Sequence, residues 1–250
     1  MSGRKVFITG GAKRLGREIA LAFANNGAAV VIHYNKSKQE AGKLVEEIAS
    51  KGNKACAVKA DVRVISQIEN AVNKGAKFLG GLDILLINNA AIFYKTPLAE
   101  TSEPQWDDFL DINCRAPFFF AKFAAPFLKK SGHGRIINIA DTYGFSPAAS
   151  YVPYGISKAG VIALTKGLAK ELAPLVLVNC VCPGVVRFPI SDFRPQKSEV
   201  RDQRSEQMAL GATLLKKEVE VQDVVDAVLF LVRNNSITGQ AVSVDGGKNV

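Results

Sequence analysis

The stretch Thr9-Gly10-Gly11-Ala12-Lys13-Arg14-Leu15-Gly16 decides the fold, because it joins the short apolar run Lys5–Thr9 to residues with helical spacing. Glycines in such a strand-to-helix turn let backbone N–H groups at the helix start approach a pyrophosphate. The alternative is a tight turn without a ligand, but a position directly after an N-terminal strand favours the phosphate site. We therefore expect dinucleotide phosphates to bind at Gly10, Lys13, Arg14, Leu15 and Gly16.

Strands and helices alternate along the rest of the chain. The predicted strands are Lys5–Thr9, Ala28–Tyr34, Lys54–Ala60, Asp83–Asn88, Arg135–Ala140, Val176–Cys182 and Gln240–Val244. After the helix that follows the glycine turn, helical spacing recurs over Lys38–Ser50, Val64–Phe78, Pro104–Lys129, Tyr154–Leu172 and Val221–Arg233. Several strands are apolar on both faces, which is typical of a parallel sheet covered by helices on both sides. The pattern predicts a single α/β domain over residues 1–250 with a doubly wound sheet.

The segment 188–217 interrupts this alternation. It contains Pro189 and Pro195, many charges and little periodicity. A long excursion after a late strand of an open α/β sheet lies near the ligand crevice, so we expect a substrate lid here.

The composition excludes several classes of protein. Hydrophobic residues make up 48% of the 250 and charged residues 22%, which argues against disorder. The four cysteines form no Cys-x-x-Cys pair and only two histidines are present, so we expect no metal site. We interpret the cysteines as small buried hydrophobes in a reducing compartment. The lack of a signal-peptide core and of about 18 consecutive apolar residues predicts a cytoplasmic protein with no membrane contact.

A net charge of +9 fits a nucleic acid, a membrane surface or an anionic small molecule as the partner. No run of lysine and arginine with interleaved aromatic residues occurs, so nucleic acid is not expected. The second predicted strand instead ends in a basic segment without the acid that would bind a ribose 2′-hydroxyl in an NAD-selective site. This absence favours NADP(H), with its 2′-phosphate bound near His33, Tyr34, Asn35, Lys36 and Ser37. The alternative is a solvated basic turn.

Two further strand ends are candidates for cofactor contacts. Asp61 and Val62 follow the third predicted strand, where a carboxylate could bind the adenine amino group. Asp61 could equally be the N-cap of the next helix. Small residues after the fourth predicted strand would let the backbone pass close to the adenosine ribose at Asn89, Ala90 and Ala91.

The candidate catalytic residues begin with Tyr154 and Lys158, which are four residues apart and therefore lie on one face of a helix. A neighbouring ammonium would stabilise the tyrosine anion and so make Tyr154 a better proton donor. Asp141 ends the fifth predicted strand 13 residues before Tyr154. Its carboxylate suits a substrate with N–H donors, although a turn cap is the alternative.

These motifs together, in order and spacing, resemble the short-chain dehydrogenase/reductase family over nearly the whole chain. The matching positions are Thr9–Gly16, Asp61, Asn88–Ala91, Asn113, Tyr154, Lys158, Pro183–Gly184 and Val244–Gly247. The resemblance implies a Rossmann-type sheet of seven parallel strands, hydride transfer from a nicotinamide and a homotetramer. It also implies that Asn113 holds a water in a proton relay and that Lys158 binds the nicotinamide ribose. Pro183, Gly184 and Val186 would contact the cofactor.

Within the family, the chain is similar to the pteridine reductase branch. Arg14 stands where glycine is usual and Asp141 where serine is usual, and Phe93 follows the Asn-Asn-Ala motif. The resemblance implies that Arg14 contacts phosphate and pterin, that Phe93 stacks on the pterin, and that Asp141 assists Tyr154 in proton delivery. An apolar patch at Phe188 would touch an aromatic ligand or pack within the lid.

These observations predict an NADPH-dependent reductase that transfers hydride to a C=N bond of a pteridine, with Tyr154 as proton donor. The alternative is a carbonyl reductase acting on a 3-oxoacyl thioester or a small ketone. A protein of another class, which senses NADP(H) without turnover, is a further alternative. The phenylalanine-rich stretch Pro117–Phe127 is apolar nearly all round and is expected to bury one side against a partner subunit.

Overall fold

The computed structural model describes residues 1–87, 91–188, 211 and 213–250. Its centre is a seven-stranded sheet with the order β3-β2-β1-β4-β5-β6-β9, in which every pair of neighbours is parallel. The strands are β1 (Lys5–Ile8), β2 (Ala29–Tyr34), β3 (Ala55–Lys59), β4 (Ile84–Ile87), β5 (Gly134–Ile139), β6 (Val176–Pro183) and β9 (Ala241–Val244). The predicted sheet of seven parallel strands is confirmed.

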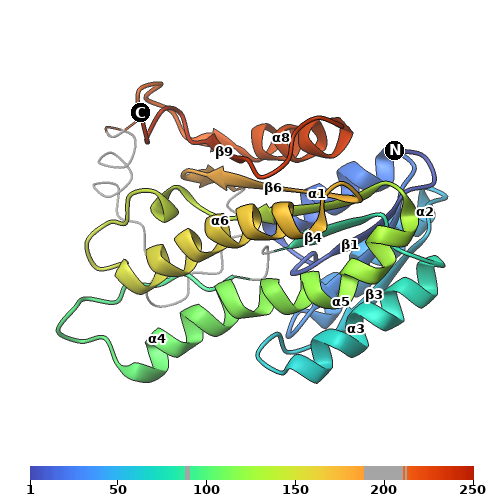
Figure 1. The fold of residues 1–250 in the computed structure, drawn as a ribbon, viewed down its shortest axis with the longest axis horizontal. Helices are drawn as coiled ribbons and strands as arrows, with labels where there is room; N and C mark the ends of the chain where they lie inside the picture. The colour runs from blue at the N-terminus through green and yellow to red at the C-terminus, as the bar shows by residue number, and fades with distance from the viewer. Residues whose placement is uncertain (88–90, 189–210, 212) are drawn as a thin grey trace.

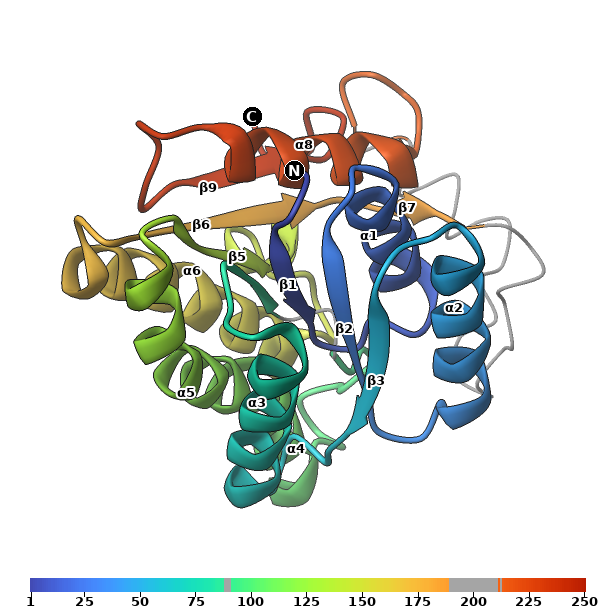
Figure 2. The same ribbon diagram turned by 90° about the vertical axis from the view of Figure 1, so that its right-hand side faces the viewer.

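Helices cover both faces of the sheet (Figures 1 and 2). One face packs against α1 (Arg14–Asn25), α2 (Lys38–Ser50) and α8 (Val221–Arg233). The other face packs against α3 (Ile65–Leu79), α5 (Ala116–Ser131) and α6 (Val152–Leu172). In β1, Val6 and Ile8 belong to the first core and Phe7 to the second, as the alternation of side chains along a strand requires.

The long helix predicted from Pro104 is divided into three parts. It comprises α4 (Glu103–Leu110), the π-helical turn η1 (Asp111–Arg115) and α5. π-helical turns inside α-helices are rare and concentrate at functional sites. This turn carries Asn113, whose side chain is fully buried.

Two features depart from the expectations. β7 (Val186–Arg187) and β8 (Val219–Glu220) form a small parallel pair that the sequence pattern did not indicate. Only Cys180 and Cys182 are buried, whereas Cys56 and Cys114 are partly exposed. The prediction of four buried cysteines was therefore wrong for two, because Cys56 lies on β3, the edge strand, and Cys114 on η1.

The order of the strands places the carboxyl ends of β1 and β4 side by side. Chain connections leave these two neighbours in opposite directions, towards β2 from β1 and towards β5 from β4. In open α/β sheets ligands bind in the crevice at such a switch point. The predicted functional residues should therefore gather at this edge.

Candidate active site

The glycine turn between β1 and α1 has the backbone of an anion site. Gly10 has φ +57°, and Arg14 also has a positive φ, +48°, which non-glycine residues rarely adopt. A Cβ on Gly11 would lie 3.2 Å from Ile8 Cγ2, so the turn is closely packed on the sheet. Helix α1 has no side-chain cap and no acid in its first turn. The first-turn N–H groups and the positive helix end therefore suit a phosphate.

His33 supports the glycine turn through a hydrogen bond to its imidazole ring. The Gly10 N–H donates to His33 Nδ1 at 3.2 Å, and His33 Nε2 lies 3.1 Å from the Ala60 carbonyl oxygen. Burial lowers the pKa of His33 to about 4, so the ring is neutral and donates from Nε2. The side chain is buried and both ring nitrogens are engaged, so His33 holds Gly10 in place through its ring. That His33 belongs to the cofactor site stays a prediction, and its bond to Gly10 would make the contribution indirect.

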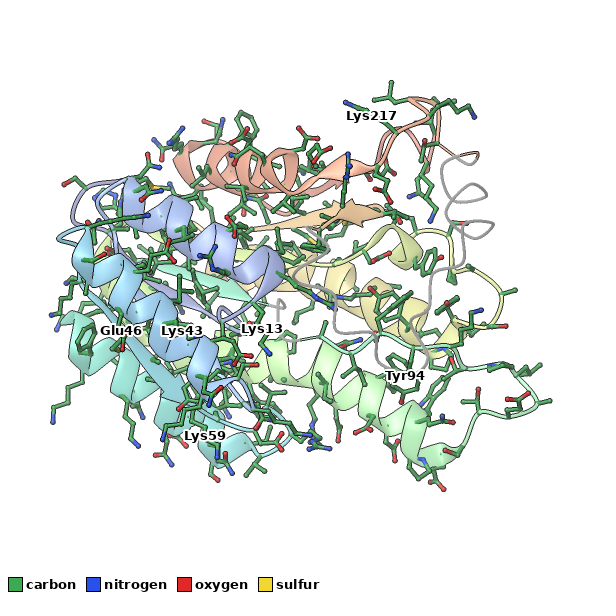
Figure 3. All side chains as sticks on the ribbon, turned by 180° about the vertical axis from the view of Figure 1, so that it is seen from behind. Lys13, Lys43, Glu46, Lys59, Tyr94 and Lys217 are labelled. Atoms are coloured by element: carbon green, nitrogen blue, oxygen red, sulfur yellow. The ribbon has the colours of Figure 1, made fainter. Side chains whose placement is uncertain are left out.

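The cations expected around a 2′-phosphate lie at the N-terminal ends of α1 and α2. Lys13, labelled in Figure 3, forms an ion pair with Glu40 of α2. Lys36 is exposed and lies next to Ser37, the N-cap residue of α2. The Ser37 side chain makes no capping hydrogen bond. The Arg14 guanidinium lies 5.9 Å from the centre of the Phe188 ring. Two predicted ligand residues, one for phosphate and one for substrate, are thus neighbours.

Asp61 has an interaction that the sequence did not indicate. Its carboxylate accepts hydrogen bonds from the Arg63 side chain at 2.9 and 3.2 Å and from the Arg63 N–H at 3.0 Å. Hydrogen bonds from Arg63 lower the pKa of Asp61. The N-cap of α3 is Val64, so the alternative role of Asp61 as that cap is wrong. Val62 beside it is buried.

The proton-transfer residues meet where β5 ends and α6 begins. The Tyr154 hydroxyl donates to Asp141 Oδ2 at 2.8 Å, while Asp141 Oδ1 accepts the Tyr143 N–H at 2.8 Å. The turn-cap interpretation of Asp141 is therefore confirmed, and the same carboxylate also holds the Tyr154 hydroxyl. The catalytic role of Asp141 stays a prediction. Burial raises the pKa of Asp141, and burial and the Asp141 charge raise the pKa of Tyr154 well above its usual value. In this state Tyr154 holds its proton.

Lys158 lies directly behind Tyr154. Its ammonium is buried, donates to the Ile139 carbonyl oxygen at 3.2 Å and lies 5.7 Å from the centre of the Tyr154 ring. Burial lowers the pKa of Lys158, whereas the charge of Asp141 opposes that shift. The two predicted catalytic partners are thus brought to one place.

Asn113 connects three segments of the site. Its Oδ1 accepts the Ile92 N–H at 3.0 Å, and its Nδ2 donates to the Ile92 carbonyl oxygen at 3.2 Å and to Ser157 Oγ at 3.1 Å. These bonds hold the chain after β4 against α6. The water-relay role expected for Asn113 stays a prediction.

Phe93 belongs to a group of aromatic rings around Tyr154. Its ring stacks on Tyr151 with centroids 4.9 Å apart and meets Tyr154 edge-on at 4.8 Å. The Tyr143 ring lies 6.4 Å away. Phe93 is 42% exposed, so one side of this aromatic group is open to a ligand.

The sequence did not single out Tyr143, Tyr151 or Lys248 as site residues. Tyr151 could have been found, because it lies three residues before Tyr154 at helical spacing. Lys248 carries no such signal; its Nζ lies 4.3 Å from the centre of the Tyr143 ring, more than 100 positions away in the chain.

Of the remaining predicted residues, the structure describes some and not others. Pro183 ends β6, Val186 is buried in β7, and Gly184 packs so closely on Asp245 that a Cβ would lie 2.9 Å from its Cα. Ala91 is exposed beside Ile92. Asn89, Ala90 and most of the segment 188–217 lie outside the described residues.

The described ranges contain neither a candidate metal site nor a candidate membrane-spanning helix. There, no group of three or more His, Cys, Asp or Glu side chains could hold a metal ion. Over the same residues, no helix has the length and apolar character needed to cross a membrane.

The switch-point crevice, the glycine turn and the Tyr154–Lys158 pair are those of a dinucleotide-dependent oxidoreductase. Comparison with known proteins agrees: residues 10–249 match the family model described as enoyl-(acyl carrier protein) reductase. The chain belongs to the short-chain dehydrogenase/reductase family.

Similar proteins cover almost the entire chain. The 3-oxoacyl-[acyl-carrier-protein] reductase FabG of Staphylococcus epidermidis is 34% identical over 248 residues, 98% of each chain. The (2S)-[(R)-hydroxy(phenyl)methyl]succinyl-CoA dehydrogenase subunit BbsD of Thauera aromatica is 32% identical over 253 residues, covering 100% of this chain and 98% of that protein. A short chain dehydrogenase of Burkholderia cenocepacia, crystallised with NADP, has a TM-score of 0.89 and 31% identity, covering 100% and 99%.

Proposed function

We propose that the protein reduces a carbonyl group with NADPH, and that its substrate is a 3-oxoacyl thioester or a related ketone. Of the two curated relatives named above, one is named for a 3-oxoacyl group on acyl carrier protein and the other for a substituted succinyl-CoA. These relatives favour the carbonyl alternative over the pteridine substrate expected first. The observation that carries the reaction itself is the Tyr154 hydroxyl, held 2.8 Å from Asp141 beside a buried Lys158.

The residues at the switch point fit NADP(H), which would supply the hydride. The uncapped start of α1 would hold the pyrophosphate, with Arg14 alongside. Lys36, and Lys13 after leaving Glu40, would hold the 2′-phosphate, since no acid ends β2. A similar solved protein was crystallised with NADP, which supports this cofactor.

Tyr154 would give its proton to the substrate oxygen as the hydride reaches the carbonyl carbon. The phenolate left behind would be repelled by an ionised Asp141 but stabilised by Lys158. Burial raises the pKa of Asp141, which favours its protonated form. We therefore assign Asp141 to pass its proton to the Tyr154 oxygen across the 2.8 Å hydrogen bond, which restores the tyrosine.

A second candidate is reduction of a C=N bond in a pteridine. The carboxylate of Asp141 favours it, because a carboxylate can accept hydrogen bonds from ring N–H groups whereas a ketone offers none. The half-exposed Phe93 ring, next to Tyr154, would stack on a flat heterocycle.

We also propose that the protein assembles as a homotetramer through the phenylalanine-rich helix α5. Phe118 on this helix is 44% exposed, and its ring packs at right angles to that of Phe119. Large exposed aromatic side chains on an apolar helix are typical of a subunit interface.

The Tyr154→Phe variant tests the proton donor. We expect turnover of an acetoacetyl thioester to fall at least about 100-fold, because the proton donor is lost. NADPH affinity, measured by fluorescence, should change little. Ile156→Ala, an exposed position on the same helix, is the control. Turnover equal to that of the unaltered protein would reject Tyr154 as donor.

A further inference from the structure

A cation from the C-terminal end of the chain approaches the proton-transfer pair. The Lys248 ammonium lies 4.3 Å from the centre of the Tyr143 ring, a distance at which a cation and an aromatic face attract each other. Tyr143 in turn donates its N–H to Asp141 Oδ1. The side chain of Lys248 is half-buried, so solvent screens its charge only in part.

A hydrogen-bonded turn fixes this lysine in place. Asp245 is buried and accepts the N–H groups of Gly247 at 2.9 Å and Asn249 at 3.2 Å, one on either side of Lys248. The Asn249 side chain adds a third hydrogen bond to Asp245 at 3.0 Å. Gly247 has φ +78°, and a Cβ there would lie 2.9 Å from Leu214 Cβ, so the turn needs glycine. The hydrogen bonds to Asp245 therefore fix the backbone on both sides of Lys248.

We propose that Lys248 is a positioning residue of the active site, whose ammonium, lying on the Tyr143 ring, favours the carboxylate form of Asp141. The inference rests on the proposed role of the Tyr154–Asp141 pair in proton transfer. Lys248 would set the pH at which this pair changes from holding two protons to holding one. It need not touch the substrate.

The other charged and titratable groups around Asp141 do not replace this role. Tyr154 and Lys158 come from α6, Tyr143 from the short 3-10 helix after β5, and Cys182 from β6. Of these only Lys158 is a cation, and it also donates to Ile139. The charges of Lys158 and Lys248 both lower the pKa of Asp141, against the larger effect of burial.

The test is the titration of Asp141 by NMR in protein labelled with carboxyl-¹³C aspartate, with the resonance assigned by its loss in Asp141→Asn. Lys248→Gln should move the midpoint upward by on the order of one pH unit, because one neighbouring positive charge is removed. Lys248→Arg should leave it in place. Lys217→Gln is the matched control, because Lys217 is exposed and points away from the molecule in Figure 3.

A second variant covers the case in which Lys248→Gln does not fold. Asp245→Asn keeps the lysine but weakens the turn, and should also move the midpoint upward. The proposal would be overturned by an unchanged Asp141 midpoint in whichever of Lys248→Gln and Asp245→Asn folds. It would also be overturned if Lys217→Gln shifted that midpoint equally. The titration needs no substrate, so a shifted midpoint in a protein that reduces no carbonyl would reject the proposed function and keep the role of Lys248.

Discussion

His33 illustrates how a single buried residue can support a binding loop from outside it. Its ring lies between the Gly10 N–H and the Ala60 carbonyl oxygen and joins the glycine turn to the end of β3. Such a bridge requires the neutral ring, because Nδ1 accepts a hydrogen bond. Protonation at Nδ1 would therefore break the contact with Gly10.

The same contact makes stability depend on pH. The unfolded His33 protonates near pH 6.5, whereas the folded one does so near pH 4. Between these values only the unfolded state binds the proton, so stability falls as the pH falls. The full loss is about 3 kcal/mol from this group. Urea unfolding from pH 7.5 to 4.5 should show this slope, and His33→Gln should flatten it.

The second histidine provides the control. His133 is exposed, so His133→Gln should keep the slope of the unaltered protein. A His33→Gln protein with an undiminished slope would contradict the assignment of a neutral, buried ring.

At the scale of elements, the glycine turn contains a strained arginine. Arg14 adopts φ +48° at the start of α1, a conformation that costs a non-glycine residue about 1 kcal/mol. In exchange, a guanidinium is placed beside the proposed pyrophosphate. Charge-assisted hydrogen bonds of this kind contribute about 1.5–3 kcal/mol. We therefore propose that ligand binding, rather than stability, accounts for arginine at this position.

Arg14→Gly separates these two effects. We expect the free energy of unfolding to hold or rise, because backbone relief offsets the lost Phe188 contact of about 0.5–1 kcal/mol. NADPH affinity, measured by calorimetry, should fall at least about tenfold. Lys216→Gly is the control, since Lys216 has φ +51° outside the turn and should change stability alone. Unchanged NADPH affinity in Arg14→Gly would contradict a phosphate contact.

The sequence predicted long elements well and short ones poorly. The seven strands and the covering helices follow from apolar runs of four or more residues, which carry a periodic signal. β7 and β8 have two residues each and pair across more than 30 positions, so no local pattern exists. The π-helical turn at Asn113 adds one residue per turn without changing helical composition.

In the site as well, residues close together in the sequence could be predicted, whereas contacts made only by tertiary packing could not. Tyr154, Lys158 and Asp141 could be predicted because they lie within 18 positions, at a strand end and on one helix face. The burial of His33 and the arrival of Lys248 depend on tertiary packing and have no local signature. The Arg63 partner of Asp61 likewise depends on side-chain conformation.

At the scale of the whole molecule, the exposed face of α5 should be covered by a second copy. Phe118→Glu places a charge in the proposed interface and should dissociate the tetramer, because burying an unpaired carboxylate is costly. Light scattering at micromolar concentration measures this directly. Leu98→Glu, at a side chain 93% exposed on a loop, is the control and should stay tetrameric. A monomeric unaltered protein would contradict the interface.

The most direct test of the central claim follows NADPH absorbance with an acetoacetyl thioester, dihydrobiopterin and dihydrofolate in parallel. We predict oxidation of NADPH with the thioester, abolished by Tyr154→Phe. Turnover with the dihydropterins alone would contradict carbonyl reduction and favour the second candidate. Tight NADPH binding without turnover of any of the three would contradict both and indicate a nucleotide-sensing protein.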